Sequence, residues 1–212
     1  KILEYRTQEL IEYQNLSYAK EYMSFVGNIF EKEQKTRSSS ELSQNVAKYL
    51  FKLMATKDEY EVARLSLKTE LDSAISKEFG KSAKINYMLH PPFLKAMENI
   101  PILNMLPGVK SKLALGSWFK IFYVMLKNMK FLRGTIFDFM AWFSNDVRKA
   151  DKKALDHYKH VIMNNIDEIG NGKYQDLKAF SVLPDIIRGY EEVRLETMTE
   201  FYHFLFHLCY SL

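Results

Sequence analysis

The sequence predicts a mainly α fold, a multi-helix bundle of long helices with one short extended segment near residues 84–92. Apolar side chains recur at helical spacing in four separate segments of the chain. Only 8 glycines and 5 prolines occur in 212 residues, and long periodic segments with so few of them favour helices over a many-stranded sheet. With 47 % hydrophobic residues the chain can bury a substantial core, so we expect one helical domain spanning residues 1–212.

The N-terminal third predicts a hairpin of two long helices. Residues 2–33 have a broad apolar and aromatic face, which indicates one continuous helix. After a polar break, Ser38 and Glu41 have the spacing of a capping box, which predicts the start of the second helix. A shorter helix is expected over residues 70–79, with Gly80 as its C-terminal cap.

Further along, the period of the pattern changes twice. Apolar and polar residues alternate over residues 84–89, and the prolines that follow require extended backbone, so we expect a short strand or strand-like loop there. A helix is predicted over residues 112–131, with Trp118 and Phe122 on its apolar side. Phe131, Ile136 and Phe137 are expected to pack in an aromatic loop after it.

The C-terminal part predicts three more helices. The first is a long helix over residues 144–169, and the second is a short one over residues 174–182. Because proline suits the first turn of a helix, we expect the last helix to begin at Pro184 and to continue to the C-terminus.

One helical face changes character between Asn45 and Leu67. It begins with apolar side chains, namely Val46, Tyr49, Leu50, Leu53 and Met54. The same face of a straight helix then continues with Lys57, Glu61 and Arg64, whose spacing of three or four residues allows them to pair.

This charged stretch, which also includes Asp58 and Glu59, has three interpretations. The helix can emerge from the core with its charges half-exposed, the charges can form a buried ion network, or they can form a ligand or partner site. For the buried arrangement, one glutamate cannot neutralise two cations, so a further carboxylate should approach from another segment. We expect Asp138 to supply it.

A basic stripe is predicted on the helix over residues 112–131 and just after it. Its members are Lys112, Lys120, Tyr123, Lys127, Lys130 and Arg133. Such a stripe is either a solvated lysine-rich face or a binding site for an anionic ligand or an acidic partner.

Motifs for catalysis and metal binding are absent from the sequence. It has no glycine-rich phosphate loop, no GxSxG and no HExxH, so no catalytic residue is assigned. Cys209 is the single cysteine, and His157 and His160 are expected at the surface, so we predict no metal site or iron–sulfur cluster in this chain. A net charge of +4 is too low to indicate nucleic-acid binding, and no apolar run reaches the roughly 18 residues of a membrane span. A reducing cytoplasm is therefore the expected compartment.

Five segments, in order along the chain, resemble the C-terminal helical region of bacterial indolepyruvate ferredoxin oxidoreductases, a branch of the 2-oxoacid:ferredoxin oxidoreductases. These segments are LIEYQNLSYAKEYMSFV, VAKYLFKLMATKDEYEVARL, LHPPFL, FLRGTIFDF and LPDIIRGYEEVRLE. The second and fourth are the most specific. Because the sequence also starts at Lys1 instead of methionine, we expect it to be excised from or appended to a larger oxidoreductase polypeptide.

The resemblance implies a role in a thiamine-diphosphate-dependent enzyme that decarboxylates aryl 2-oxoacids, forms an acyl-coenzyme A and passes electrons to ferredoxin. The thiamine diphosphate, magnesium and iron–sulfur clusters are expected in other modules, since their motifs do not occur here. The first expected function is therefore a non-catalytic accessory domain that packs on or orients the catalytic modules or subunits. The alternative is a binding module for an anionic ligand or acidic protein, such as coenzyme A or ferredoxin, through the basic stripe.

Overall fold

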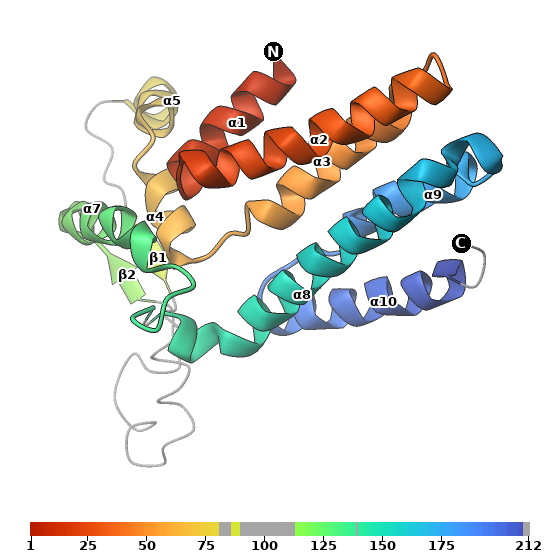
Figure 1. Ribbon diagram of the computed structural model, residues 1–212. Helices are drawn as coiled ribbons and strands as arrows, with labels where there is room; N and C mark the ends of the chain where they lie inside the picture. Colours follow the sequence, from red (N-terminus) through yellow and green to blue (C-terminus); the bar gives the residue numbers. More distant parts are fainter. Residues whose placement is uncertain (81–85, 90–112, 139, 210–212) are drawn as a thin grey trace. The chain divides into compact units, whose positions relative to one another are not determined.

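The computed structural model describes residues 1–80, 86–89, 113–138 and 140–209. Helices dominate these residues, which confirms the mainly α prediction (Figure 1). The chain divides into two compact units, one formed by residues 1–56 with 146–212 and the other by residues 57–145. Two compact units can belong to one domain, so the single domain over residues 1–212 stays a prediction.

The first unit is a bundle of helices around one apolar core. Its helices are α1 (Ile2–Tyr13), α2 (Leu16–Thr36), α3 (Glu41–Met54), α8 (Ala141–Asn165), α9 (Tyr174–Val182) and α10 (Glu191–Cys209), with the 3-10 turns η4 (Ile166–Asn171) and η5 (Leu183–Asp185). Helix α2 packs against α1 and α3, and α3 also packs against α9. Large side chains with no exposed surface fill the core, among them Tyr22, Leu50, Ile162 and Phe201.

The single helix predicted over residues 2–33 is wrong, because the chain breaks between α1 and α2. Asn15 adopts extended backbone there, and its side-chain oxygen accepts a hydrogen bond of 2.9 Å from the backbone N–H of Tyr18. Asparagine is a strong N-cap because its side chain satisfies one of the free N–H groups of the first turn. That local bond starts a new helix inside a stretch whose apolar periodicity continues.

A residue of another helix caps α3, in place of the predicted capping box. Ser40 precedes the helix without a side-chain cap, whereas the fully buried carboxylate of Glu33 on α2 accepts from the backbone N–H groups of Leu42 and Ser43 at 2.9 and 2.8 Å. The hydroxyl of Tyr174 donates a third bond of 2.8 Å to Glu33. Burial raises the pKa of the Tyr174 phenol, so it remains protonated and able to donate.

The last helix begins later than predicted. Pro184 lies in the short turn η5, and α10 starts only at Glu191. Gly189 lies between them with a φ of +80°, a conformation that disfavours any side chain and that interrupts the helical path. The helix predicted over residues 174–182 is confirmed by α9, and the helix predicted over residues 144–169 corresponds to α8 followed by η4.

The second unit combines short helices with a strand pair. Its elements are α4 (Glu59–Ser66), α5 (Thr69–Phe79), β1 (Tyr87–Leu89), β2 (Leu113–Leu115), η2 (Ser117–Phe119), α7 (Lys120–Asn128) and η3 (Met129–Leu132). Helices α4 and α7 pack together around a second, smaller core that consists of Tyr60, Ala63, Phe119, Tyr123 and Leu126.

Strands β1 and β2 pair antiparallel, with Met88 opposite Ala114. Strand β1 confirms extended backbone within the predicted segment 84–92, of which residues 84, 85 and 90–92 lie outside the described residues. The helix predicted from residue 112 instead starts at Lys120, since Leu113–Leu115 form the second strand. The predicted helix over residues 70–79 is confirmed by α5, and Gly80 follows it with a φ of +84°.

No helix within the described ranges is both long enough and apolar enough to cross a membrane.

Candidate functional site

The charged stretch predicted from the sequence lies in the second unit, but not on a straight helix. Helix α3 ends at Met54 and α4 begins at Glu59, so four residues of irregular backbone separate the apolar face from the charged one. Asp58 ends this break as the N-cap of α4, where its Oδ1 accepts a bond of 2.9 Å from the backbone N–H of Glu61. The prediction of one continuous face is therefore wrong, because a capping aspartate started a separate helix.

Asp58 also binds a cation from a distant part of the sequence. The guanidinium of Arg133 donates to both carboxylate oxygens of Asp58, from Nε to Oδ2 at 2.5 Å and from Nη2 to Oδ1 at 2.8 Å. The side chains of Asp58 and Arg133 are only 8 % and 12 % exposed. The same guanidinium lies 5.5 Å from the ring centre of Tyr60, a cation–π distance. Asp58 thus holds the residues before Gly134 against the start of α4.

Glu61 and Arg64 form a second paired group on α4. Nε and Nη2 of Arg64 each donate to one oxygen of Glu61, both at 2.8 Å. The side chain of Arg64 is 4 % exposed and that of Glu61 is 7 % exposed. The glutamate lies in the first turn of the helix and the arginine in the last turn, an order that the helix dipole favours. Buried charges at this depth persist only when they are paired, and this pair is bidentate.

Asp138 is buried as predicted, and neutral donors are among its hydrogen-bond partners. Its carboxylate accepts from the hydroxyl of Tyr60 at 2.9 Å and from the backbone N–H groups of Gly134 and Ala141 at 3.0 and 3.2 Å. Two of these donors lie in its own segment and the third lies on α4, so Asp138 ties the loop after η3 to that helix. We call the charged network the group formed by Asp58, Glu61, Arg64, Arg133 and Asp138, together with Tyr60.

Two members of the predicted network lie elsewhere. Lys57 is exposed, because it sits in the break between α3 and α4 and not on the buried side of α4. Glu59 is half-buried in the first turn of α4. The sequence pattern did not indicate Arg133 as a network member, since Arg133 pairs with a residue 75 positions away and no periodicity links the two.

The structure does not assemble the predicted basic stripe as one open cationic face. Lys120 pairs with Asp72 of α5 at 2.8 Å, and this hydrogen bond raises the pKa of the lysine. Tyr123 is buried, with a pKa raised by burial, and Arg133 belongs to the charged network. Lys127 is exposed and Lys130 half-buried. Lys112 lies outside the described residues.

Helix α7 instead exposes apolar side chains. Trp118 in η2, directly before α7, is 64 % exposed, and Ile121, Val124 and Met125 in α7 are 78 %, 48 % and 47 % exposed. These four side chains recur at helical spacing, and we call the surface they form the apolar face of α7. The expectation that Trp118 faces inward is wrong, since Phe119 fills that place in the core. Phe131, Ile136 and Phe137 in the following loop are also exposed, contrary to the predicted packed loop. Exposed apolar surface of this kind marks protein contacts more often than isolated apolar residues do.

The charged network stabilises the packing of α4 against the loop around Gly134. Its carboxylates accept from guanidinium, phenol and backbone donors within the fold, which leaves the network suited to fixing α4 and the loop around Gly134. Among the described residues, no group of three or more histidine, cysteine, aspartate or glutamate side chains is placed so that it could hold a metal ion.

The protein is mainly helical. Its second unit contains both the buried charged network and the exposed apolar face of α7. The chain belongs to DUF6537, a family of unknown function, whose model matches residues 1–205. No curated protein and no solved structure matches the chain.

Proposed function

We propose that this chain is a non-catalytic accessory domain of a thiamine-diphosphate-dependent indolepyruvate ferredoxin oxidoreductase, where it packs on or orients the catalytic modules or subunits. The resemblance of five segments to the C-terminal helical region of that family suggests the enzyme. In this proposal thiamine diphosphate, magnesium and the iron–sulfur clusters belong to the other modules, and the compartment is the cytoplasm.

The apolar face of α7 is the observation that supports a docking role. Three large apolar side chains of α7, together with Trp118 of η2 directly before it, are at least 47 % exposed on one face. Directly beneath them, Phe119, Tyr123 and Leu126 are buried in the core of the second unit, which holds the helix in place. A rigid helix that presents aromatic and aliphatic anchors is typical of the centre of a protein interface.

The experiment measures binding of the chain to the separately produced catalytic modules. Replacing Trp118 and Ile121 by aspartate should weaken binding by at least about tenfold, since the interface would then have to bury a charged carboxylate at each position. The matched control replaces Ile2 and Tyr5, which are 67 % and 61 % exposed on α1 of the first unit, by aspartate and should leave binding unchanged. Equal affinities for the two double variants would refute docking through α7.

The alternative function, binding of an anionic ligand or an acidic protein such as coenzyme A or ferredoxin through the basic stripe, has less support. Lys120 and Arg133 are neutralised by Asp72 and Asp58. If the stripe nevertheless takes part, replacing Lys120 and Lys127 by glutamate should weaken binding of reduced or oxidised ferredoxin and flatten its salt dependence. An unchanged salt slope would remove this alternative.

A further inference from the structure

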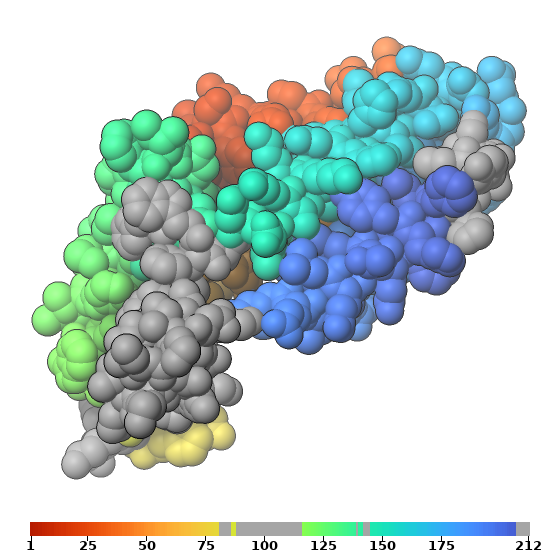
Figure 2. Space-filling view, turned by 90° about the horizontal axis from the view of Figure 1, so that it is seen from below, coloured from red at the N-terminus to blue at the C-terminus, as the bar shows by residue number. Residues whose placement is uncertain are grey.

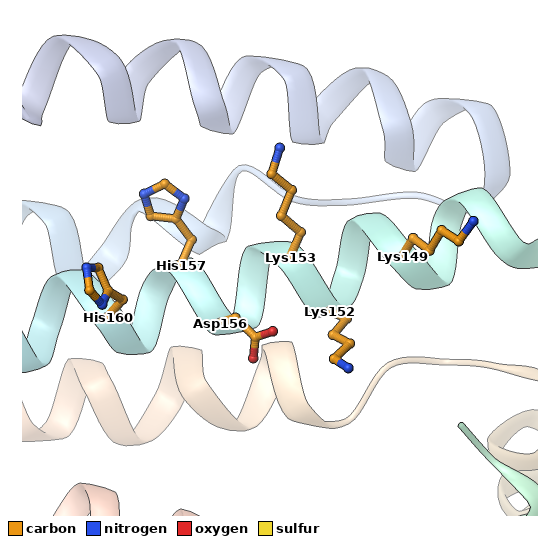
Figure 3. Close-up of a pocket in the computed structure, with 6 residues that line it drawn as sticks. All are labelled: Lys149, Lys152, Lys153, Asp156, His157 and His160. Carbon is orange, nitrogen blue, oxygen red and sulfur yellow. The ribbon is translucent and has the colours of Figure 1, made fainter. Parts of the chain in front are cut away.

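One face of α8 forms an open groove in the first unit, whereas the charged network belongs to the second unit. The groove has a volume of about 550 Å³ and is lined by Lys149, Lys152, Lys153, Asp156, His157 and His160 (Figure 3). Their spacing places all six on one side of the helix. Helices α8 and α10 lie side by side at the surface (Figures 1 and 2), and Lys153 and His157 point toward α10.

The charges in this groove do not balance. Three ammonium groups line it with one carboxylate, and the structure shows no ion pair for Lys149, Lys152 or Lys153 among the residues it describes. Three other lysines of the same unit face an acidic partner. Lys32 pairs with Asp167, Lys173 with Glu168 and Lys178 with Glu41. Lys149, Lys152 and Lys153 therefore give this groove a net positive charge.

Tyr202 of α10 lies next to two of the residues that line the groove. The ring of Tyr202 lies 5.2 Å from Nζ of Lys153 and 6.0 Å from the ring of His157. Its hydroxyl is buried and has no hydrogen-bond partner among the described residues. A buried hydroxyl without a partner is uncommon in proteins, and the ring that carries it lies near Lys153 and His157.

We propose that this groove binds a small molecule that carries a phosphate or diphosphate group. Clustered lysines bind phosphate oxygens as point charges, and imidazole N–H groups can donate further hydrogen bonds to the same oxygens. The volume falls in the range of small-molecule sites, about 300–1,000 Å³. This inference goes beyond the proposed accessory role and does not depend on it, since the groove and the apolar face of α7 belong to different units.

Calorimetric titration of the 212-residue chain with inorganic pyrophosphate tests the proposal. We expect saturable binding that weakens as salt is added, because exposed charges are screened. A variant with Lys149, Lys152 and Lys153 changed to glutamine should bind at least about tenfold more weakly, whereas arginine at the same three positions should retain binding.

The matched control changes Lys32, Lys173 and Lys178 to glutamine, which removes the same net charge from the same unit. It should keep the affinity within about twofold, since each of these lysines already has a carboxylate partner. All six substitutions lie on the surface, and circular dichroism of each variant verifies the fold. A control that loses as much affinity as the groove variant would show attraction to net charge alone and would overturn the proposal.

Imidazole resonances locate the site independently. Pyrophosphate should shift the signals of His157 and His160 and leave that of His203, on the exposed side of α10, in place. Absence of saturable binding, or shifts that spare His157 and His160, would also overturn the proposal.

Discussion

Lys57 and Arg64 have the same charge and lie seven residues apart, yet only the arginine is buried. Changing Arg64 to alanine leaves the carboxylate of Glu61 buried without its bidentate partner. Breaking a buried pair in this way costs about 3–5 kcal/mol, so we expect a loss of that size in the free energy of unfolding measured with urea.

Changing Lys57 to alanine is the control, and it should cost less than about 1 kcal/mol because the side chain is exposed. A loss below about 1 kcal/mol for the arginine variant as well would mean that the pair behaves as a surface pair.

His157 should titrate below an ordinary histidine. Burial is the largest cause that lowers its pKa, and the charges of His160 and Lys153 lower it further. Changing Lys153 to glutamine should therefore raise the pKa of His157, measured by NMR titration of the imidazole. Changing Lys149 to glutamine removes the same charge two helical turns away and should leave that pKa in place.

The sign of the effect on stability follows from the lowered pKa. The unfolded chain binds a proton at His157 more readily than the folded chain does, so stability falls as pH drops through the unfolded value of about 6.5. The Lys153 variant should lose less stability over that interval than the original chain. A steeper loss in the variant would contradict the assigned direction.

At the scale of elements, α3 depends on a cap from α2. Glu33 accepts two backbone N–H bonds and one phenol bond in a fully buried position. Glutamine at this position keeps one carbonyl acceptor but turns the other oxygen into a donor that faces other donors. We expect a loss of about 1–3 kcal/mol in the free energy of unfolding, since buried donors would lose their acceptor.

The neighbouring Glu31 supplies the control for the cap, because it is exposed on the same helix. Changing it to glutamine should shift the urea midpoint little. Equal shifts for the two variants would show that a general loss of negative charge, and not the cap, determines the stability of α3.

At the scale of the whole molecule, the two units have separate cores. Leu50 is fully buried in the first core, and Leu126 is 4 % exposed in the second. A leucine-to-alanine change at either position should cost about 2–5 kcal/mol through the lost contacts and the cavity left behind. Hydrogen exchange should then rise mainly within the unit that contains the change.

The two leucine variants serve as controls for each other. Leu50→Ala should speed exchange in helices such as α2 and α9, and Leu126→Ala should speed it in α4 and α7. Uniform acceleration over the whole chain in both variants would indicate one cooperative unit.

Much of the helical content was predictable, because helical periodicity is a local signal. The helices over residues 70–79 and 174–182 were predicted within one residue of α5 and α9. The breaks at Asn15 and Asp58 were not predicted, since helical periodicity continues across both positions. Asparagine and aspartate occur on helix surfaces as well as at caps, and only the bond to the following N–H distinguishes the two roles.

The candidate site was predicted in part. Glu61, Arg64 and Asp138 are buried as expected, but Arg133, which was assigned to a surface stripe, pairs with Asp58. Which carboxylate meets which guanidinium depends on how α4 and the loop after η3 pack together. That packing joins residues about 75 positions apart, and pair spacing along a helix contains no information about it.

The sequence by itself determined the mainly helical class, the short extended segment around Tyr87–Leu89 and the lack of recognisable catalytic motifs. Each follows from residue type and spacing within a few turns of backbone. Tertiary structure alone decided the division into two cores, the capping of α3 by Glu33, the pairing of Arg133 with Asp58 and the exposure of Trp118. These features depend on contacts between segments distant in the chain, where the free energy of burial and pairing outweighs local preference.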